Sequence, residues 1–297
     1  MADPDFPSPK AEDAFRRAEA LIERAIAEGK TKISFSGYEW VDAAKEKLPH
    51  LTSLPKQILE IKDLTLVDLE DTQASDQAAE TLAQAPNLQT LYLSNTQVTD
   101  KAAEALAQAP NLQTLTLNNT QVTDKAVEAL AQAPILEMLT LSNTQITDKA
   151  AEALAQAPIL QTLYLSNTQV TDKAAEALAQ APILEMLSVD NTQVTVAGVR
   201  ALAAAEGFSG TGNGHLRTLS LDGTPALAQD DGLRAVYEDP GDKDRTEAVF
   251  DYARDWVGPV DPTKSPDLDD VFTIVADDGV VNIVPLRPDA EEQQDPI

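Results

Sequence analysis

Two histidines and a short run of aspartates are the residues whose types could support metal or acid–base chemistry. His50 and His215 are the only histidines in the 297-residue chain, and imidazole is a common zinc ligand and general base. A zinc ion shared by both would need carboxylate ligands and a fold that joins distant parts of the chain, so we expect each to be a loop or surface residue. Asp239-x-x-Asp242-x-Asp244 resembles a calcium-binding loop but lacks the glycine and the terminal glutamate at the required positions. We therefore predict no metal site and no cofactor.

The chain also lacks the residues usually required for nucleophilic catalysis and for phosphate binding. The chain contains no cysteine, which removes thiolate nucleophiles, disulfides and cysteine-ligated metals. It contains none of the motifs G-x-x-x-x-G-K-[ST], G-x-G-x-x-G, G-x-S-x-G and H-E-x-x-H. We predict that the chain is not an enzyme, with an unrecognised site in the C-terminal region as the remote alternative.

The charge balance excludes several classes of partner. The chain has 49 acidic and 22 basic residues, a formal net charge of −27. Such a surface repels phosphate backbones and anionic headgroups, so we expect neither nucleic acid nor membrane partners. The acidity either keeps the protein soluble or favours a basic partner. The first residues show no signal peptide and no apolar run is long enough to span a bilayer, so we predict a cytoplasmic protein.

A repeat of 24 residues dominates the middle of the chain. Residues 87–110, NLQTLYLSNTQVTDKAAEALAQAP, recur with few changes at 111–134, 135–158 and 159–182, after a degenerate copy at 63–86 and before a diverging one from 183. Each unit begins with L-x-x-L-x-L, which predicts a short strand. Residues 100–109 place Ala102, Leu106 and Ala109 on one helical face, with Thr99 or Asp100 as the N-cap and a proline at 110 to stop the helix.

The repeated positions resemble the signature of the leucine-rich-repeat family. The match is Leu88-x-x-Leu91-x-Leu93-x-x-Thr96-x-Val98. The length and the small residue in the first helical turn resemble a bacterial type similar to the ribonuclease-inhibitor-like subclass named after its Gly-Ala-Leu-Ala motif. Residues 198–203, Gly-Val-Arg-Ala-Leu-Ala, come closest to that motif. The resemblance covers about residues 60–226 and implies an α/β horseshoe-shaped solenoid with a parallel concave sheet and convex helices.

One position departs from the family pattern, because threonine stands where asparagine is commonest. We expect the stacked hydroxyl groups to bond the backbone of the turn, so that the fold tolerates the change. These positions are Thr72, Thr96, Thr120, Thr144, Thr168, Thr192 and Thr224.

The sequence divides into four parts. Residues 1–62 form a capping helix at 9–28, capped by Ser8 and stopped by Gly29, and a first irregular repeat with an insertion at 38–50. Residues 63–226 form the array, which includes an added loop at 207–214. Residues 227–258 form a helical cap with helices at 228–237 and 243–257. Residues 259–297 form an acidic tail with a hairpin at 271–284, and together with the preceding helices they give the array an α+β C-terminal cap.

The outward positions of the concave strands are the predicted contact surface. They form a neutral, hydroxyl-rich sheet with an acidic margin at each end, and tyrosine and methionine are common in adaptable interfaces. We predict a protein-binding scaffold for a protein or peptide ligand. The alternative is a regulatory or targeting arm of a larger protein, acting through the C-terminal region. The oligomeric state is left open. The predicted contact residues are Tyr92, Thr116, Met138, Thr140, Tyr164 and Met186.

The helices of the predicted convex side repeat one charge pattern. Residues 100–104, Asp-Lys-Ala-Ala-Glu, recur almost unchanged. Charges three and four positions apart lie on the same helical face, so we expect solvent-exposed ion pairs within each helix.

Overall fold

A computed structural model describes residues 6–37, 44–204, 216–240, 245, 248–249, 252–253, 272–277 and 280–285. The chain divides into two compact units, Met1–Asp255 and Trp256–Ile297. In the second unit, β10 (Phe272–Asp277) pairs antiparallel with β11 (Val280–Pro285). All other elements belong to the first unit.

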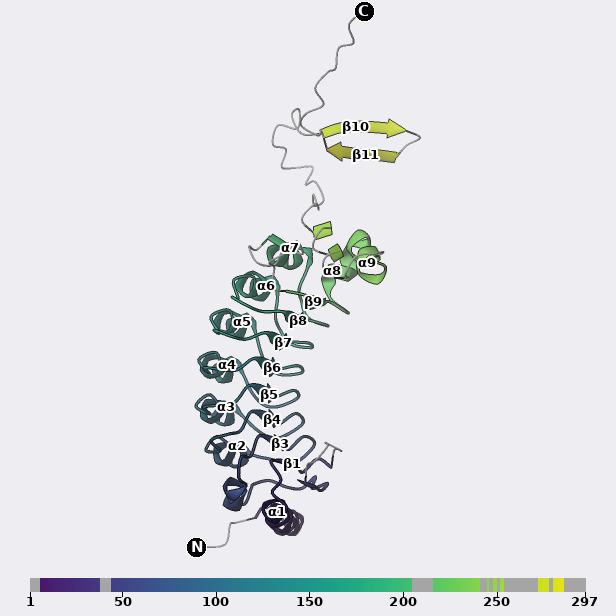
Figure 1. Ribbon diagram of the computed structural model, residues 1–297. Helices are drawn as coiled ribbons and strands as arrows, with labels where there is room; N and C mark the ends of the chain where they lie inside the picture. The colour runs from purple at the N-terminus through teal and green to yellow at the C-terminus, as the bar shows by residue number, and fades with distance from the viewer. Residues whose placement is uncertain are drawn as a thin grey trace, which may run out of the picture. The chain divides into compact units, whose positions relative to one another are not determined.

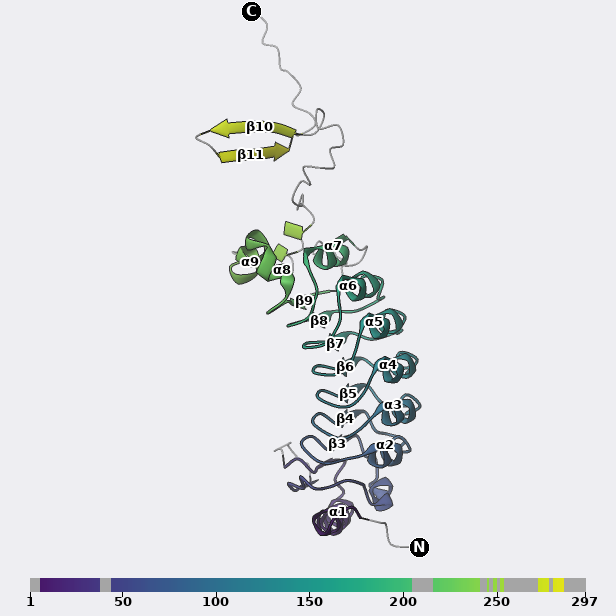
Figure 2. The same cartoon turned by 180° about the vertical axis from the view of Figure 1, so that it is seen from behind.

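The first unit is a single layer of short strands covered on one side by helices (Figures 1 and 2). Its parallel strands follow the order β2-β1-β3-β4-β5-β6-β7-β8-β9. The strands are β1 (Lys32–Ser34), β2 (Ala44–Lys45), β3 (Leu66–Asp68), β4 (Thr90–Tyr92), β5 (Thr114–Thr116), β6 (Met138–Thr140), β7 (Thr162–Tyr164), β8 (Met186–Ser188) and β9 (Thr218–Ser220). The helices are α1 (Pro9–Ala27), the 3₁₀ helix η1 (Lys56–Glu60), α2 (Asp76–Leu82), α3 (Asp100–Leu106), α4 (Asp124–Leu130), α5 (Asp148–Leu154), α6 (Asp172–Leu178), α7 (Val196–Ala204), α8 (Pro225–Gln229) and α9 (Asp231–Glu238).

The alternation of buried and partly exposed side chains accounts for each strand, and one threonine stabilises the turn after it. In β4 the side chain of Leu91 is fully buried, while Thr90 and Tyr92 on either side of it are partly exposed. The turn that follows requires a left-handed residue, and Asn95 adopts a φ of +59° there. Thr96 Oγ1 donates a hydrogen bond of 2.6 Å to the carbonyl of Leu93, and the equivalent threonine bonds the equivalent carbonyl in every repeat from Thr72 to Thr224. The expected role of the threonine ladder is confirmed.

The helices are shorter than the sequence predicted. Helix α3 begins at Asp100 but ends at Leu106, before Ala109, although both of these apolar side chains are buried. The amide of Ala109 donates to the carbonyl of Leu106 and not to the carbonyl four residues back. This tighter turn directs the chain back towards the sheet, so the helix is already finished when Pro110 follows.

A carboxylate at the start of each helix ties it to the next repeat. Thr147, the N-cap of α5, donates its backbone N–H to Asp124 Oδ1 at 2.8 Å and its hydroxyl to Asp124 Oδ2 at 2.6 Å. The same pair of bonds recurs from Asp76 to Asp172. The threonine is therefore the helix cap, and the aspartate joins neighbouring repeats.

The ion pairs of the helical side also join neighbouring repeats. Lys101 lies 2.7 Å from Glu80, and Lys125 lies 2.7 Å from Glu104. The predicted pairing within one helix is thus wrong for these residues, because the adjacent helix brings a carboxylate closer. Both lysine side chains are 70% exposed, and such pairs contribute little stability.

Helix α1 covers the N-terminal end of the array. Ser8 accepts a hydrogen bond from the amide of Ala11, and Gly29 follows the helix with a φ of +63°, as the sequence predicted. Ile22 is fully buried, whereas Ile26 is 38% exposed. Leu21, the residue before Ile22, is buried as well. The spacing of apolar residues shows which side of the helix is buried, but not how far along the helix the covering surface extends.

The two ends of the array differ in detail from the predicted elements. Part of the predicted insertion at 38–50 forms the edge strand β2. The helix predicted at 228–237 is two short helices, α8 and α9, with Asp230 capping the second. Ala248, Val249 and Ala253 are buried, while residues 38–43, 205–215 and 254–271, which include Trp40, His215 and Trp256, lie outside the described residues. None of the helices in the described part is both long and apolar enough to cross a bilayer.

Candidate partner-binding face

One face of the sheet carries no helix from the array. Helices α2–α7 stack along one side, and the strands lie along the other (Figures 1 and 2). Because the parallel strands pair in exact register, residues one repeat apart stand directly beside each other. We call the outward surface of β4–β8 the open face.

Tyrosines flank two threonines in one row of the open face. Tyr92 pairs with Thr116, Thr116 with Thr140 and Thr140 with Tyr164. The two tyrosines are partly exposed, whereas Thr116 and Thr140 are only 8% and 7% exposed. The threonines therefore form a floor between the aromatic rings and offer little surface of their own.

Methionines occupy a second row beside the first. Met138 and Met186 are both partly exposed and flank Thr162. The hydroxyl of Tyr164 donates to Met186 Sδ at 2.9 Å, which holds the ring against the thioether. The fold thus brings the six predicted contact residues onto five neighbouring strands, and their contact with a partner stays a prediction.

One hydroxyl on the open face has no partner among the described residues. Thr140 Oγ1 is buried and makes no hydrogen bond there. By contrast, Thr116 Oγ1 accepts a bond from Ser94 at 3.0 Å and donates to Glu70 Oε1 at 3.2 Å. A buried polar atom without a partner is unfavourable, so the Thr140 hydroxyl is a vacant hydrogen-bonding position on this face.

Carboxylates crowd the N-terminal margin of the face, which we define as Asp68, Glu70 and Asp71. Asp68 is 1% exposed and accepts hydrogen bonds from the hydroxyls of Ser34 and Ser36 and from the amide of Glu70. Asp71 accepts a bond from Asn95 Nδ2 at 2.9 Å. Hydroxyl, amide and backbone N–H donors thus orient Asp68 and Asp71.

The crowding changes the titration of two residues. Burial raises the pKa of Glu70, and the neighbouring charges of Asp68 and Asp71 add to this, although hydrogen bonds from Ser94 and Thr116 oppose it. Burial likewise raises the pKa of Tyr92, with the charges of Glu70 and Asp68 contributing. Burial is the larger cause of both shifts, and the neighbouring carboxylates add to it.

We expect Glu70→Gln to stabilise the protein at neutral pH. Because the folded pKa of Glu70 is raised, the folded state binds this proton more tightly than the unfolded chain does, and stability falls as the pH rises through that range. The gain at pH 7 should be below about 1 kcal/mol, since the side chain is only half-buried, and it should shrink below about pH 4. Urea denaturation at both pH values measures it, with Glu128→Gln on the exposed surface of α4 as the control. An equal loss of stability at both pH values would contradict the prediction.

The C-terminal margin, Asp190 and Asp222, is also acidic. Asp190 accepts hydrogen bonds from the hydroxyl of Ser188 at 2.9 Å and from the amide of Asp222 at 2.8 Å. Asp222 is exposed and lines a depression of about 320 Å³ together with Glu238, Arg234 and other residues of the C-terminal cap. Arg217, directly before β9, lies 4.0 Å from Glu185.

The sequence matches two family models in this region. Residues 57–148 match the model described as FBD-associated F-box protein At5g56370, LRR repeats, and residues 157–179 match a leucine-rich-repeat model. The matched segments contain the buried leucines and the turn threonines described above. The array is made of leucine-rich repeats. Its assignment to the 24-residue Gly-Ala-Leu-Ala subclass stays a prediction.

Solved leucine-rich-repeat structures resemble the chain only broadly. Internalin C2 from Listeria monocytogenes is 22% identical, with a TM-score of 0.48, over 73% of this chain and 94% of that one. An internalin, inlF, from the same organism is 17% identical, with a TM-score of 0.43, over 74% and 76%. Likenesses this low say nothing about what this leucine-rich-repeat protein binds. No curated protein matches the sequence.

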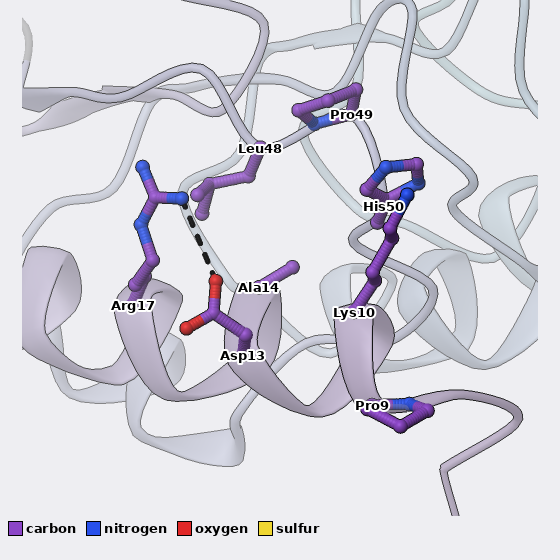
Figure 3. Close-up of a pocket in the computed structure, with 8 residues that line it drawn as sticks. All are labelled: Pro9, Lys10, Asp13, Ala14, Arg17, Leu48, Pro49 and His50. Atoms are coloured by element: carbon purple, nitrogen blue, oxygen red, sulfur yellow. Dashed lines mark ion pairs between the residues drawn. The ribbon is translucent and has the colours of Figure 1, made fainter.

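A second depression, of about 400 Å³, lies at the N-terminal cap of the leucine-rich-repeat array and contains His50 (Figure 3). Arg17 is the central charged residue, and it contacts Asp13 at 3.6 Å and Glu46 at 2.6 Å. These carboxylates already neutralise the arginine, so the charges here hold α1 to the segment that follows β2. Among the described residues no three metal-binding side chains come together, and His215 lies outside them.

Proposed function

We propose that this leucine-rich-repeat protein is a protein-binding scaffold, not an enzyme, and that its open face holds the ligand. One observation carries the proposal: strand register aligns two partly exposed tyrosines and two partly exposed methionines on a sheet face that the helices of the array leave uncovered. Tyrosine supplies large contact area at low entropic cost, and methionine adapts to varied surfaces.

The proposal can be tested with a photo-crosslinking amino acid placed at single positions. Position 164 on β7 replaces a partly exposed tyrosine, and position 176 on α6 is an exposed control on the opposite side. The crosslinker p-benzoylphenylalanine should capture proteins from a native cell extract at position 164 and not at position 176. Adducts formed at 176 but not at 164 would contradict use of the open face.

The alternative of a regulatory arm that acts through the C-terminal region is favoured only by the depression beside α9. Position 238 at the exposed end of α9 serves as a third crosslinking site. Adducts formed at 238 alone would favour this alternative over the open face.

A further inference from the structure

Basic residues are missing from the whole sheet side of the central repeats. Between residues 63 and 216 the only lysines and arginines are Lys101, Lys125, Lys149, Lys173 and Arg200, and all five lie on helices α3–α7. Strands β3–β8 and the turns that follow them carry carboxylates but no ammonium or guanidinium group. No ammonium or guanidinium group lies between the two margins on this face, and the nearest ones beyond the N-terminal margin are Lys32 on β1 and Lys45 on β2.

The carboxylates are not spread evenly along it. Apart from Glu137 and Glu185, which directly precede β6 and β8, they gather at the N-terminal margin after β3 and at the C-terminal margin after β8 and β9, while the row between the margins holds neutral threonines and tyrosines. Six strand spacings separate β3 from β9, which is about 29 Å at about 4.8 Å each. A ligand matched to this face carries two positive groups at that separation.

We propose, on the basis of the proposed function, that the ligand is a basic polypeptide segment lying across strands β3–β9. Its cationic side chains bind the two acidic margins, and its uncharged middle lies over the threonine floor between Tyr92 and Tyr164. The hydroxyl of Thr140, which is buried and without a partner in the described part of the free chain, turns towards the ligand and takes a hydrogen bond from that middle section. The tyrosine rings also present faces that attract guanidinium and ammonium groups.

Synthetic peptides test the spacing directly. Between their inner arginines, two Arg-Arg pairs separated by nine Gly/Ser residues can extend to about 35 Å at most, whereas a three-residue spacer extends to about 14 Å at most. In fluorescence anisotropy at about 0.15 M salt, the long peptide should bind at least about 10-fold more tightly than the short one, because both margins are engaged together. Matched peptides with Gln or Glu in place of Arg should bind more weakly still.

Variants of the full chain separate specific binding from general attraction to an acidic protein. Glu70→Gln at one margin and Asp222→Asn at the other should each weaken the long peptide about 3- to 10-fold and remove its advantage over the short one. Thr140→Val should weaken it about 2- to 5-fold, as expected for one lost hydrogen bond. Glu128→Gln, the same charge change on the helical side, should have less than a twofold effect.

The outcomes also distinguish this inference from the proposed function. Equal binding of the long and short peptides, equal sensitivity to Glu128→Gln and Glu70→Gln, or no binding by either arginine peptide would overturn the basic-segment proposal. If the Gln or Glu peptide binds best and Tyr92→Ala with Tyr164→Ala weakens it, the open face binds ligands but not basic ones. If Tyr92→Ala with Tyr164→Ala leaves the affinity of every bound peptide unchanged, and crosslinking at position 164 also fails, the proposed function itself is wrong.

Discussion

Ile22→Ala is expected to lower the free energy of unfolding by about 2–5 kcal/mol, the usual cost of removing a fully buried isoleucine. Ile22 has no exposed surface and belongs to the buried side of α1, the helix that covers the N-terminal end of the array. The terminal repeat depends on this contact, because a solenoid without its cap exposes apolar core to water. Urea denaturation followed by circular dichroism measures the loss.

Ile26→Ala is the matched control, since the same substitution is made one turn later in the same helix. Ile26 is 38% exposed, so its loss should be within about 1 kcal/mol, and alanine's higher helix propensity offsets part of it. Equal losses for the two variants would show that the C-terminal turn of α1 packs as tightly as its middle. That result would contradict the prediction, which depends on Ile22 being more deeply buried than Ile26.

Asp124→Ala should cost about 2–3 kcal/mol, the second large effect. The substitution removes both hydrogen bonds from Thr147 to a charged acceptor, and each such bond contributes about 1.5–3 kcal/mol when formed without strain. It also removes a negative charge from the N-terminus of α4, where the helix dipole favours it. Partial exposure of both residues keeps the total below the sum of these contributions.

Two comparisons isolate the role of the carboxylate. Asp124→Asn keeps an acceptor for the amide of Thr147 but loses the acceptor for its hydroxyl, so about 1 kcal/mol should be lost. Glu128→Ala removes the same charge from an exposed position of the same helix and should change stability by less than about 0.5 kcal/mol. A comparable loss in Glu128→Ala would mean that net charge, and not the contact between repeats, determines the effect.

The open face illustrates a conflict between stability and binding. Glu70 is held half-buried beside two further carboxylates, and its raised pKa reports the cost of that arrangement. Glu70→Gln is therefore expected to stabilise the free protein and to weaken the basic peptide. Opposite effects of one substitution on stability and on affinity are typical of functional positions.

The repeat period and the residue types within it were sufficient to predict the strands, the turn and which segment of each repeat is helical. Leucines at alternate positions, a threonine three residues later and a Thr-Asp pair before an alanine-rich run each favour one local conformation, and identical units must stack to bury them. Stacking in register then follows from the equal length of the units. For the same reason, the sequence alone places the six predicted contact residues on one face of the sheet.

The tertiary structure decided what depends on the neighbouring repeat. The sequence left open whether Thr99 or Asp100 caps the helix, because each side chain can accept a bond from the first turn. Only the next repeat shows that the carboxylate of Asp100 is bonded to Thr123. The pairing of Lys125 with Glu104 on the preceding helix, the exposure of Ile26 and the burial of Thr140 have the same origin. Periodicity specifies the direction of a side chain, but the surface that meets it is supplied by a neighbouring repeat, 23 positions away for Asp100 and 21 for Lys125.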